Sequence, residues 1–575
     1  MLKNLRSNPR LLLDDCLLIG IMAVLAACGL IYEYLLSHYS ARVLGSMETV
    51  IYAMIGIMIV AMGLGAFAAK KIKDPYLGFA WLEVSVALIG CGATIFLASL
   101  IGFTQYLPQI IADTFAIPVD MLPLGGMFES LVKFSLVMPY VFGFLLGFLI
   151  GMEIPLIARI REDIYGKHLS NNVGTIYGAD YIGAGVGAAI WVIVMLKIEI
   201  NQAAALTASL NLVAGVIFFV RYRGQIKTRV WLVISHLILA LMIFMVYCYG
   251  GQWSNKMQDL LYLDKVVHQQ QTRFQNLVFT RRDMSGNLPS AYSFYINGRL
   301  QFSSMDEQIY HQMLVHPAMS VSARHNKVLI IGGGDGLALR EVLKWPVESV
   351  KLVDLDDELV DLFQYPERYL PDDLSRVVMR LTQNAFNDSR VSVVNSDAFV
   401  EVDSLLQQGA LFDTIIVDLP DPSHPDLNKL YSKHFYARLR QLLYGDGAIV
   451  VQSTSPFHAK QAFISIGKTL AAAGFSHTEQ YHQNVPSFGE WGWSIATKMG
   501  APASVRAQQQ QPLFPFELTW LNAEVFQAAL VFPADYYRQR DQVLVNELGT
   551  HTLYQYHHQA WQSEMGLEID TTAEK

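Results

Sequence analysis

Residues 327–356 read KVLIIGGGDGLALREVLKWPVESVKLVDLD, and this stretch decides the fold of the second half of the chain. An apolar run rich in β-branched residues, 328–331, predicts a buried parallel strand. The glycine-rich residues 332–336 end that strand, a helical pattern follows over 337–343, and a second strand is expected over 350–355. This order of strand, glycine turn, helix and strand with a terminal acid is typical of a doubly wound nucleotide-binding sheet. We therefore expect an α/β Rossmann-like domain here.

An acidic residue, Asp335, stands inside the glycine turn and says more about the ligand than the glycines do. Glycine-rich turns often only allow a helix to pack closely on a sheet. A carboxylate in such a turn repels a phosphate or carboxylate group of a ligand and attracts an ammonium group. The sequence therefore indicates a positively charged ligand.

The composition divides the chain near Gly250. Over all 575 residues, 52% are hydrophobic and only 16% are charged, against about 25% in an ordinary soluble domain. Before Gly250 lie about seven apolar stretches long enough to cross a bilayer, which takes about 20 residues. They are 16–36, 49–69, 78–100, 131–154, 175–196, 203–220 and 230–249. We expect an α-helical multi-span membrane domain in the cell's inner membrane, with the lipid bilayer as its partner.

Basic residues gather in alternate loops of this half. They are Lys3, Arg6 and Arg10 before the first stretch, Lys70, Lys71 and Lys73 after the second, Arg159, Arg161 and Lys167 after the fourth, and Arg221, Arg223, Lys227 and Arg229 after the sixth. By the positive-inside rule the N-terminus is cytoplasmic. Seven crossings then place the second half on the far side of the membrane, unless one stretch is re-entrant or another crossing exists. Both alternatives stay open.

Cysteine content and charge exclude several classes of function. All four cysteines, Cys16, Cys28, Cys91 and Cys248, lie in the apolar stretches. The second half therefore has neither a disulfide framework nor a cysteine zinc site, and we expect no metal. The net charge of −8, without a basic stripe, argues against nucleic-acid binding.

A small antiparallel β lobe is expected before the Rossmann-like part. Strand patterns cover 276–280 and 291–296, and Asn297-Gly298 is typical of a two-residue hairpin turn. A helix over 305–319 follows. The expected domains are 1–250 for the membrane part, 251–320 for the β lobe and its helix, 321–500 for the Rossmann-like part, and 501–575 for a Gln-rich linker and C-terminal extension.

Acidic residues follow four strand-like runs, namely the two described above, one before residue 397, and a buried strand expected over 414–417. They are Asp335, Asp354, Asp397 and Asp418, and Asp421 comes shortly after the last of them. The carboxyl ends of parallel strands meet at one edge, where such sheets bind their ligands. One or two of these residues are explained equally well as N-caps of the next helix, a position that Asp favours. Four together predict a strongly negative site that suits a polycation.

Seven motifs then point to one family. They are Phe274-Gln275-Asn-Leu-Val, Asn297-Gly298-Arg-Leu-Gln301, Asp306-Glu307-Gln-Ile-Tyr310-His311, Gly332-Gly-Gly-Asp335-Gly336, Asp354-Leu-Asp356, Asp397-Ala398 and Asp418-Leu-Pro-Asp421-Pro422-Ser-His-Pro425. In order and spacing they resemble the spermidine synthases, in the subgroup of polyamine aminopropyltransferases that is fused to a multi-span membrane domain. The resemblance covers residues 271–498, and the residues after 500 resemble the C-terminal extension of that subgroup.

The resemblance implies a reaction and its substrates. The aminopropyl group of decarboxylated S-adenosylmethionine would pass to putrescine or a related diamine, giving spermidine and methylthioadenosine. No cofactor is implied besides this co-substrate, and association into a homo-oligomer is left open. Because decarboxylated S-adenosylmethionine lacks the carboxylate of S-adenosylmethionine, an acid in the glycine turn selects for it.

The resemblance also assigns roles to residues. Asp418 would be the proton acceptor, because an alkylamine has a pKa near 10.4 and is protonated at neutral pH. The expected polyamine-binding residues are Tyr310, His311, Asp335 and Asp421. The expected residues for decarboxylated S-adenosylmethionine are Gln275, Gln301, Gly333, Asp354, Asp397, Ala398 and Pro425, with Asp354 on the ribose and Asp397 on the adenine amino group.

The chain departs from the family pattern at several positions. Asp354 and Gln312 each stand where the family usually has Glu. Leu419-Pro420 replaces small hydroxyl or thiol residues, and Ser423-His424 replaces an apolar residue and a glycine. The reaction is still expected, whereas the preferred amine acceptor is left open.

Two other functions compete with aminopropyl transfer. A methyltransferase that uses S-adenosylmethionine has the same class I fold, but Asp335 and the pair Asp418 and Asp421 argue against it, because its cofactor carries a carboxylate. A polyamine transporter or sensor with a non-catalytic binding domain is the other alternative. Its path would be lined by Glu33, Glu83 and Asp180 in the apolar stretches.

Overall fold

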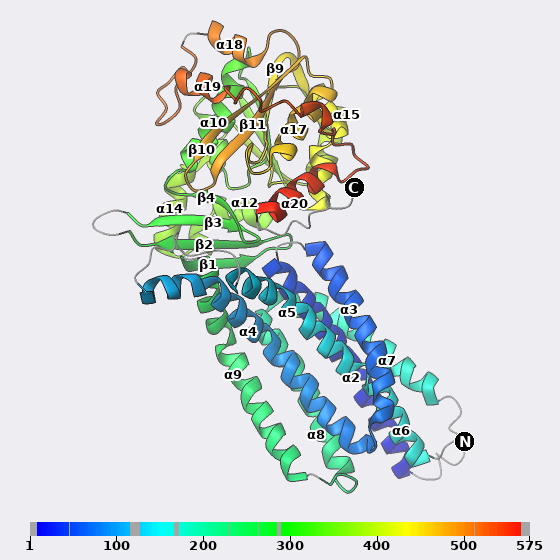
Figure 1. Cartoon of the computed structure of the whole chain (residues 1–575). Helices are drawn as coiled ribbons and strands as arrows, with labels where there is room; N and C mark the ends of the chain where they lie inside the picture. The colour runs from blue at the N-terminus through cyan, green and yellow to red at the C-terminus, as the bar shows by residue number, and fades with distance from the viewer. Residues whose placement is uncertain are drawn as a thin grey trace. The chain divides into compact units, whose positions relative to one another are not determined.

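The chain forms two compact units, Met1–Val266 and Val267–Lys575 (Figure 1). The computed structural model describes residues 9–44, 47–115, 127–165, 172–227, 229–262, 264–284, 289–510 and 512–564. Lys3, Arg6 and Lys167, which entered the prediction of orientation, lie outside these residues, as does the end of the C-terminal extension.

The first unit is a bundle of long apolar helices. Its helices are α2 (Pro9–Leu44), α3 (Met47–Ala68), α4 (Pro75–Phe115), α5 (Met127–Ile150), α6 (Glu153–Tyr165), α7 (Asn172–Ile193), α8 (Ile200–Tyr222) and α9 (Arg229–Leu261), with short turns η1 (Ala69–Lys71) and η3 (Met195–Lys197). Within the described residues, seven helical segments are long and apolar enough to cross a membrane. They lie at the seven predicted positions, so the prediction of about seven apolar helices is confirmed.

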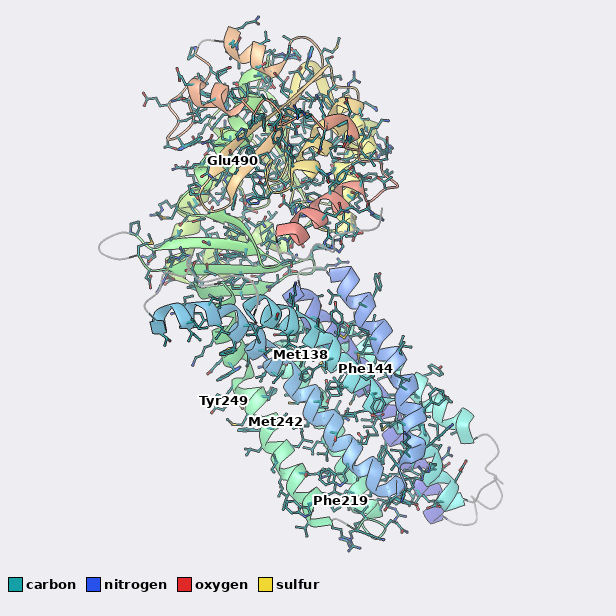
Figure 2. All side chains as sticks on the ribbon, in the orientation of Figure 1. Met138, Phe144, Phe219, Met242, Tyr249 and Glu490 are labelled. Atoms are coloured by element: carbon teal, nitrogen blue, oxygen red, sulfur yellow. The ribbon has the colours of Figure 1, made fainter. Side chains whose placement is uncertain are left out.

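Small residues bring two of these helices into close contact. A Cβ atom added to Gly183 on α7 would lie 2.1 Å from the carbonyl oxygen of Ala23 on α2. One at Gly187 would lie 2.5 Å from the carbonyl oxygen of Ala27. Glycine is therefore required along this contact, as in other tightly packed apolar helices. Larger, half-buried side chains, among them Met138 and Phe219, pack against the apolar core of the bundle elsewhere (Figure 2).

The second unit begins with a four-stranded sheet in the order β1-β2-β3-β4. Its strands are β1 (Lys265–Gln271), β2 (Asn276–Arg282), β3 (Ala291–Ile296) and β4 (Arg299–Ser303). Strands β2, β3 and β4 pair antiparallel, and Asn297-Gly298 turns between the last two with φ of 51° and 79°. Two positive φ angles are what a two-residue hairpin needs, and Asn and Gly adopt them most readily. Helix α10 (Glu307–Val321) follows.

A seven-stranded sheet forms the rest of this unit, in the order β10-β11-β9-β8-β5-β6-β7. The parallel strands are β5 (Lys327–Gly332), β6 (Ser349–Asp354), β7 (Val391–Asn395), β8 (Phe412–Asp418) and β9 (Leu443–Gln452). Strand β11 (Gly489–Thr497) pairs antiparallel with β9 on one side and with β10 (His477–Val485) on the other. The prediction of a Rossmann-like domain is confirmed. Because the chain reverses its strand order between β5 and β8, the ligand crevice is expected at the carboxyl ends of these strands.

Helices and short turns connect the strands and form the C-terminal extension. They are α11 (Leu337–Leu343), α12 (Asp357–Gln364), α13 (Pro366–Tyr369), α14 (Asp372–Thr382), η4 (Ala385–Asn387), α15 (Ala398–Gln407), η5 (Pro425–Tyr431), α16 (Lys433–Leu442), α17 (Lys460–Ala472), α18 (Ala503–Gln509), α19 (Ala523–Ala529), η6 (Arg540–Gln542) and α20 (Thr552–Glu564).

Strand β5 is buried on both faces, which explains its nearly continuous apolar sequence. Val328 and Ile330 belong to one hydrophobic core, together with residues of α10 and α11. Leu329 and Ile331 belong to another core, together with residues of α15, α16 and α17. Alternate side chains of a strand point to opposite faces, so β5 is covered by helices on both sides.

The four-stranded sheet is attached to the seven-stranded one through Thr272. Its hydroxyl donates to Asp356 Oδ2 over 2.6 Å and accepts from the backbone N–H groups of Phe274 and Gln275. Asp356 in turn caps α12, since its Oδ1 accepts from Leu359 N. One buried hydroxyl therefore fixes the loop that carries Gln275 to the end of strand β6.

Replacing Thr272 by valine should loosen this attachment. The change keeps the shape of the side chain but leaves Asp356 Oδ2 without its donor, which costs about 1–3 kcal/mol. Hydrogen exchange followed by mass spectrometry on the full-length chain should show that the free energy of opening falls by about this amount in the peptides of β2 and α12.

Thr280→Val is the matched control. Thr280 is fully buried in β2, and its hydroxyl has no hydrogen bond within the described residues. Its loss leaves no partner without a donor, so the free energy of opening should stay the same or rise, and opening should not become easier. Equal effects of the two substitutions would contradict the attachment.

Candidate active site

The glycine turn after β5 meets the end of β8. Gly332 lies opposite Asp418 in the pairing of the two strands and has a φ of +79°. A Cβ atom on Gly332 would lie 2.1 Å from the carbonyl oxygen of Asp418, and Gly333 N donates to that oxygen over 3.1 Å. Gly333 itself leaves only 3.3 Å between an added Cβ and Asp418 Oδ2. Glycines are needed here for backbone conformation and for close approach.

Asp354, at the end of β6, faces the same turn. Its Oδ2 accepts from Gly334 N and its Oδ1 accepts from Asp356 N, each over 3.0 Å. Burial raises the pKa of Asp354 to about 6, although the two N–H groups oppose the rise. The carboxylate is therefore held in place by backbone N–H groups.

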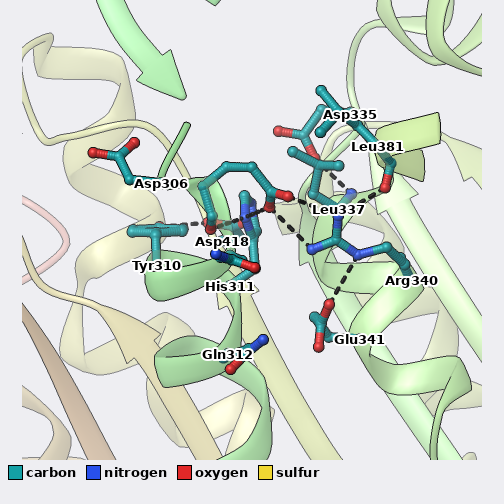
Figure 3. A network of polar contacts seen from close by, with 12 residues as sticks. Asp306, Tyr310, His311, Gln312, Asp335, Leu337, Arg340, Glu341, Leu381 and Asp418 are labelled. Carbon is teal, nitrogen blue, oxygen red and sulfur yellow. Dashed lines mark hydrogen bonds and ion pairs between the residues drawn. The ribbon is translucent and has the colours of Figure 1, made fainter. Parts of the chain in front are cut away.

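Asp418 ends β8 and is held by a tyrosine. Tyr310 Oη, on α10, donates to Asp418 Oδ1 over 2.7 Å (Figure 3). Burial and the neighbouring charge of Asp335 raise the pKa of Asp418 to about 6, while His311 and the Tyr310 hydroxyl act in the opposite direction. The ring of Tyr310 packs between Phe488 and Trp493, with centroid distances of 5.9 and 5.6 Å. This packing fixes the hydroxyl beside the carboxylate.

Asp335 is a second half-buried acid near Asp418. Its Oδ1 accepts from Leu337 N over 2.9 Å at the start of α11. Burial raises its pKa above the ordinary value, although the nearby His311 and the Leu337 N–H oppose this. Asp335 and Asp418 are thus close enough for the charge of one to affect the other.

A buried ionic network positions α10 against α11 (Figure 3). Arg340 donates to both carboxylate oxygens of Glu307, over 2.8 and 3.0 Å, and to Glu341 Oε1 over 2.8 Å. His311 Nδ1 lies 2.9 Å from Glu307 Oε2. Burial lowers the pKa of His311, but the hydrogen bond and charge of Glu307 outweigh it and the pKa lies above its ordinary value. Glu307 therefore orients His311 next to Asp335 and Asp418.

Asp421 has a different environment from Asp418, three residues earlier. Its Oδ1 accepts from Gln452 Nε2 over 3.1 Å, and its Oδ2 lies 3.4 Å from His557 Nε2 on α20. Burial alone would raise its pKa, but His557, Arg299 and Gln452 together lower it below the ordinary value. Asp421 therefore stays ionised.

Sequence reasoning missed these three partners of Asp421. Arg299 lies inside one of the quoted motifs, but nothing in the motif indicates its partner. Gln452 and His557 lie on β9 and in the C-terminal extension, and no local pattern marks them.

The remaining expected residues are more scattered. Asp397 caps α15 through Phe399 N, as the alternative explanation predicted, and also accepts from Lys429 Nζ over 2.6 Å. Ala398 is the first residue of α15, and Pro425 is the first residue of η5. Gln301 Nε2 donates to the carbonyl of Arg299 within its own hairpin. The backbone of Gln275 is bonded to Thr272, which places this residue beside the end of β6.

Gln312, which departs from the family pattern, bonds to the C-terminal extension. Its Nε2 donates to Thr519 Oγ1 over 2.7 Å, and its Oε1 accepts from the N–H groups of Trp520 and Leu521. An amide supplies both the donor and the acceptors that this segment requires, which a carboxylate would not do. Within the described residues, no group of three His, Cys, Asp or Glu side chains is placed to hold a metal ion.

Comparisons with known proteins agree with these motifs. Residues 307–508 match the Spermine/spermidine synthase domain. A polyamine aminopropyltransferase of Shewanella oneidensis is 56% identical over 556 residues, which cover 97% of this chain and 96% of that protein. Polyamine aminopropyltransferase 1 of Streptomyces coelicolor is 34% identical over 544 residues, or 93% of each chain. The crystal structure of spermidine synthase from Thermotoga maritima matches with a TM-score of 0.41 and 26% identity, over 48% of this chain and 88% of that one.

Glu307→Gln should weaken the network between α10 and α11. The substitution removes the negative partner of buried Arg340, and breaking a buried ion pair on one side costs roughly 3 kcal/mol or more. We expect the lower end of that range, because Arg340 keeps Glu341. Hydrogen exchange of the α10 and α11 peptides in the full-length chain measures the change.

Glu367→Gln, at an exposed position on α13, is the control and should have no effect on these peptides. If the two variants exchange alike, Glu307 does not hold α10 in place.

Proposed function

The chain belongs to the polyamine aminopropyltransferase family, and on this premise we propose that its amine acceptor is putrescine or a related diamine. It transfers the aminopropyl group of decarboxylated S-adenosylmethionine, as the family does. The observation that supports a diamine is the set of half-buried acids Asp335, Asp418 and Asp421. Carboxylates that have lost much of their water favour a cationic ligand, because water screens the attraction less there. Because the chain belongs to this family, the alternative function as a methyltransferase is set aside.

The transfer forms one C–N bond and breaks one C–S bond. The acceptor nitrogen attacks the aminopropyl carbon that is bonded to the sulfonium, and the C–S electron pair leaves with sulfur as the neutral thioether methylthioadenosine. The sulfonium therefore needs no acid to depart. Holding nitrogen, carbon and sulfur in line supplies much of the acceleration, since good orientation contributes about 7–11 kcal/mol.

We propose that Asp418 accepts the proton that the attacking amine loses. A free alkylamine has a pKa near 10.4, so it arrives as an ammonium ion and must lose a proton to become a nucleophile. Asp418 is half-buried, and its Oδ1 is held by the Tyr310 hydroxyl. A pKa of about 6 leaves the carboxylate ionised at neutral pH and more basic than an ordinary aspartate. Asp421 and Asp335 would bind ammonium groups of the same acceptor.

The co-substrate is assigned to the side of the glycine turn. Gly333 lets the ligand approach the backbone, and Asp354, held by two N–H groups, would bind the ribose hydroxyls. Asp397 would bind the adenine amino group, which requires it to share or release Lys429. Gln275, Gln301, Ala398 and Pro425 complete this proposed subsite.

We further propose that the first unit spans the inner cell membrane with a cytoplasmic N-terminus. Support comes from its seven long apolar helices and from the basic residues in alternate loops.

Asp418→Asn should lower turnover by about 10²–10⁴-fold, the usual contribution of a general base. In the unsubstituted enzyme, kcat/KM should fall as the pH drops below about 6, because Asp418 then gains a proton. Tyr310→Phe removes a hydrogen bond that lowers the pKa of Asp418, so this acid limb should move to higher pH. Initial rates with putrescine, measured across pH, provide the test.

Tyr369→Phe, at an exposed tyrosine, should leave the pH profile unchanged. An acid limb that stays in place in Tyr310→Phe, together with an active Asp418→Asn enzyme, would refute this assignment of the base.

A second candidate function concerns the first unit, and two buried acids favour it. Glu83 on α4 and Glu153 on α6 are each only 1% exposed. Asn211 Nδ2 donates to Glu83 Oε2 over 3.0 Å, but Glu83 Oε1 and Glu153 Oε2 have no hydrogen bond within the described residues. A carboxylate in such surroundings is costly unless a cation or a proton compensates it. We propose that this unit takes up alkylammonium ions, with Glu33 and Asp180 on the same path.

Glu83→Gln should therefore abolish uptake of labelled putrescine into proteoliposomes while aminopropyl transfer continues. Asp418→Asn should lower aminopropyl transfer while uptake continues. The exposed Glu162, replaced by Gln, is the control. Uptake by the unsubstituted chain no greater than that of empty vesicles would remove this second function and leave the first untouched.

A further inference from the structure

The C-terminal extension is docked beside the active site by two buried asparagines. Asn428, in η5, donates through Nδ2 to the carbonyl of Thr550 and accepts at Oδ1 from Tyr554 N over 3.4 Å. Asn546 Nδ2 donates to the backbone carbonyl of Asn428 over 3.0 Å. Asn428 is 2% exposed and Asn546 is fully buried. Since η5 begins at Pro425 of the family motif, the extension is bonded directly to the segment that follows Asp421.

Helix α20 presents two buried side chains on one face. Leu553 is fully buried in the core that contains residues of α16 and α17. His557 lies four residues later, which places it on the same face, and it is 1% exposed. Its Nε2 reaches Asp421 Oδ2 at 3.4 Å. The segment that matches the family domain ends at residue 508, so this histidine comes from outside it.

The two oxygens of Asp421 are held from two directions. Oδ1 is bound by Gln452 Nε2, and this amide is itself fixed by the carbonyl of Leu419, over 2.9 Å, and by the N–H of Thr454, over 2.7 Å. Oδ2 faces His557. A carboxylate with one donor at each oxygen cannot rotate freely, and its remaining lone pairs point in fixed directions. The side chain keeps 12% exposure, so it is not sealed off from a ligand.

The positive groups around Asp421 set it apart from Asp418. Arg299 attracts it from the hairpin between β3 and β4, and His557 attracts it from α20. His558, next along α20, interacts with both of these groups. Asp418 has the Tyr310 hydroxyl and nearby His311 but also the repelling charge of Asp335. Two acids three residues apart are thus prepared for different tasks, one to gain a proton and one to stay charged.

We propose that His557 is a positioning residue for Asp421, so that the C-terminal extension builds part of the wall that binds the amine acceptor. The proposal rests on the proposed function in one respect, the assignment of Asp421 to the acceptor. His557 touches neither substrate in this scheme and acts only through the carboxylate. Its loss should therefore change acceptor binding and leave binding of the aminopropyl donor unchanged.

The test uses the full-length chain in detergent, with separate KM values for putrescine and for decarboxylated S-adenosylmethionine. His557→Ala should raise the KM for putrescine about tenfold and leave the KM for the donor unchanged. His557→Gln, which keeps a donor at a similar reach, should restore most of the loss. Gln559→Ala, at an exposed position on the same helix, should behave as the unsubstituted enzyme.

A double-mutant cycle separates positioning from mere stabilisation. If His557 acts through Asp421, the KM for putrescine in the double variant Asp421→Asn with His557→Ala should match that of Asp421→Asn alone. Additive effects, a parallel rise in both KM values, or no rescue by Gln would each overturn the proposal. Asp421→Asn with an unchanged KM for putrescine would instead refute the assignment of Asp421, and so distinguishes failure of the proposed function from failure of the inference.

Discussion

The desolvation of three half-buried carboxylates at the ends of neighbouring parallel strands is the constraint on which the rest of the site depends. Asp335, Asp354 and Asp418 form no ion pair with Lys or Arg within the described residues, and are held by backbone N–H groups and one tyrosine hydroxyl. Ionised carboxylates are costly to bury without a counter-charge. Under the proposed function, binding of a cationic acceptor would offset this cost.

The strong cations of this region are used in the framework instead. Arg340 is shared by Glu307 and Glu341, and His316 Nε2 lies 2.7 Å from Glu341 Oε2 while Trp345 Nε1 donates to its other nitrogen. These contacts bind α10 to α11 without neutralising the acids of the site. Because α10 carries both Tyr310 and His311, the stiffness of this network determines where the hydroxyl and the imidazole stand. The positive charge of Arg340 therefore serves the contact between α10 and α11, and the acids of the site keep their negative charge.

Features governed by local pattern were predictable from the sequence. The strand over 328–331 and the helix over 337–343 appear as β5 and α11, because burial on both faces and a glycine turn leave clear patterns. The contacts of Asp421 with Gln452 and His557 join segments 31 and 136 residues apart, which no pattern within one segment encodes. The same is true of the pair Asp397 and Lys429, and of Gln312 with residues 519–521. The spacing of residues in the sequence identifies acids at strand ends, whereas the tertiary structure determines which cation each acid contacts.

The position of α20 after the Rossmann-like sheet in the chain has a consequence for biosynthesis. Asn428 and Asn546 can dock α20 only once it has left the ribosome, after the apolar helices have emerged and the Rossmann-like sheet has been made. A nascent chain that stops before α20 therefore contains both aspartates of the Asp418 motif but lacks the imidazole beside the second one. Residues up to His557 must have been synthesised before that corner of the protein takes its final form.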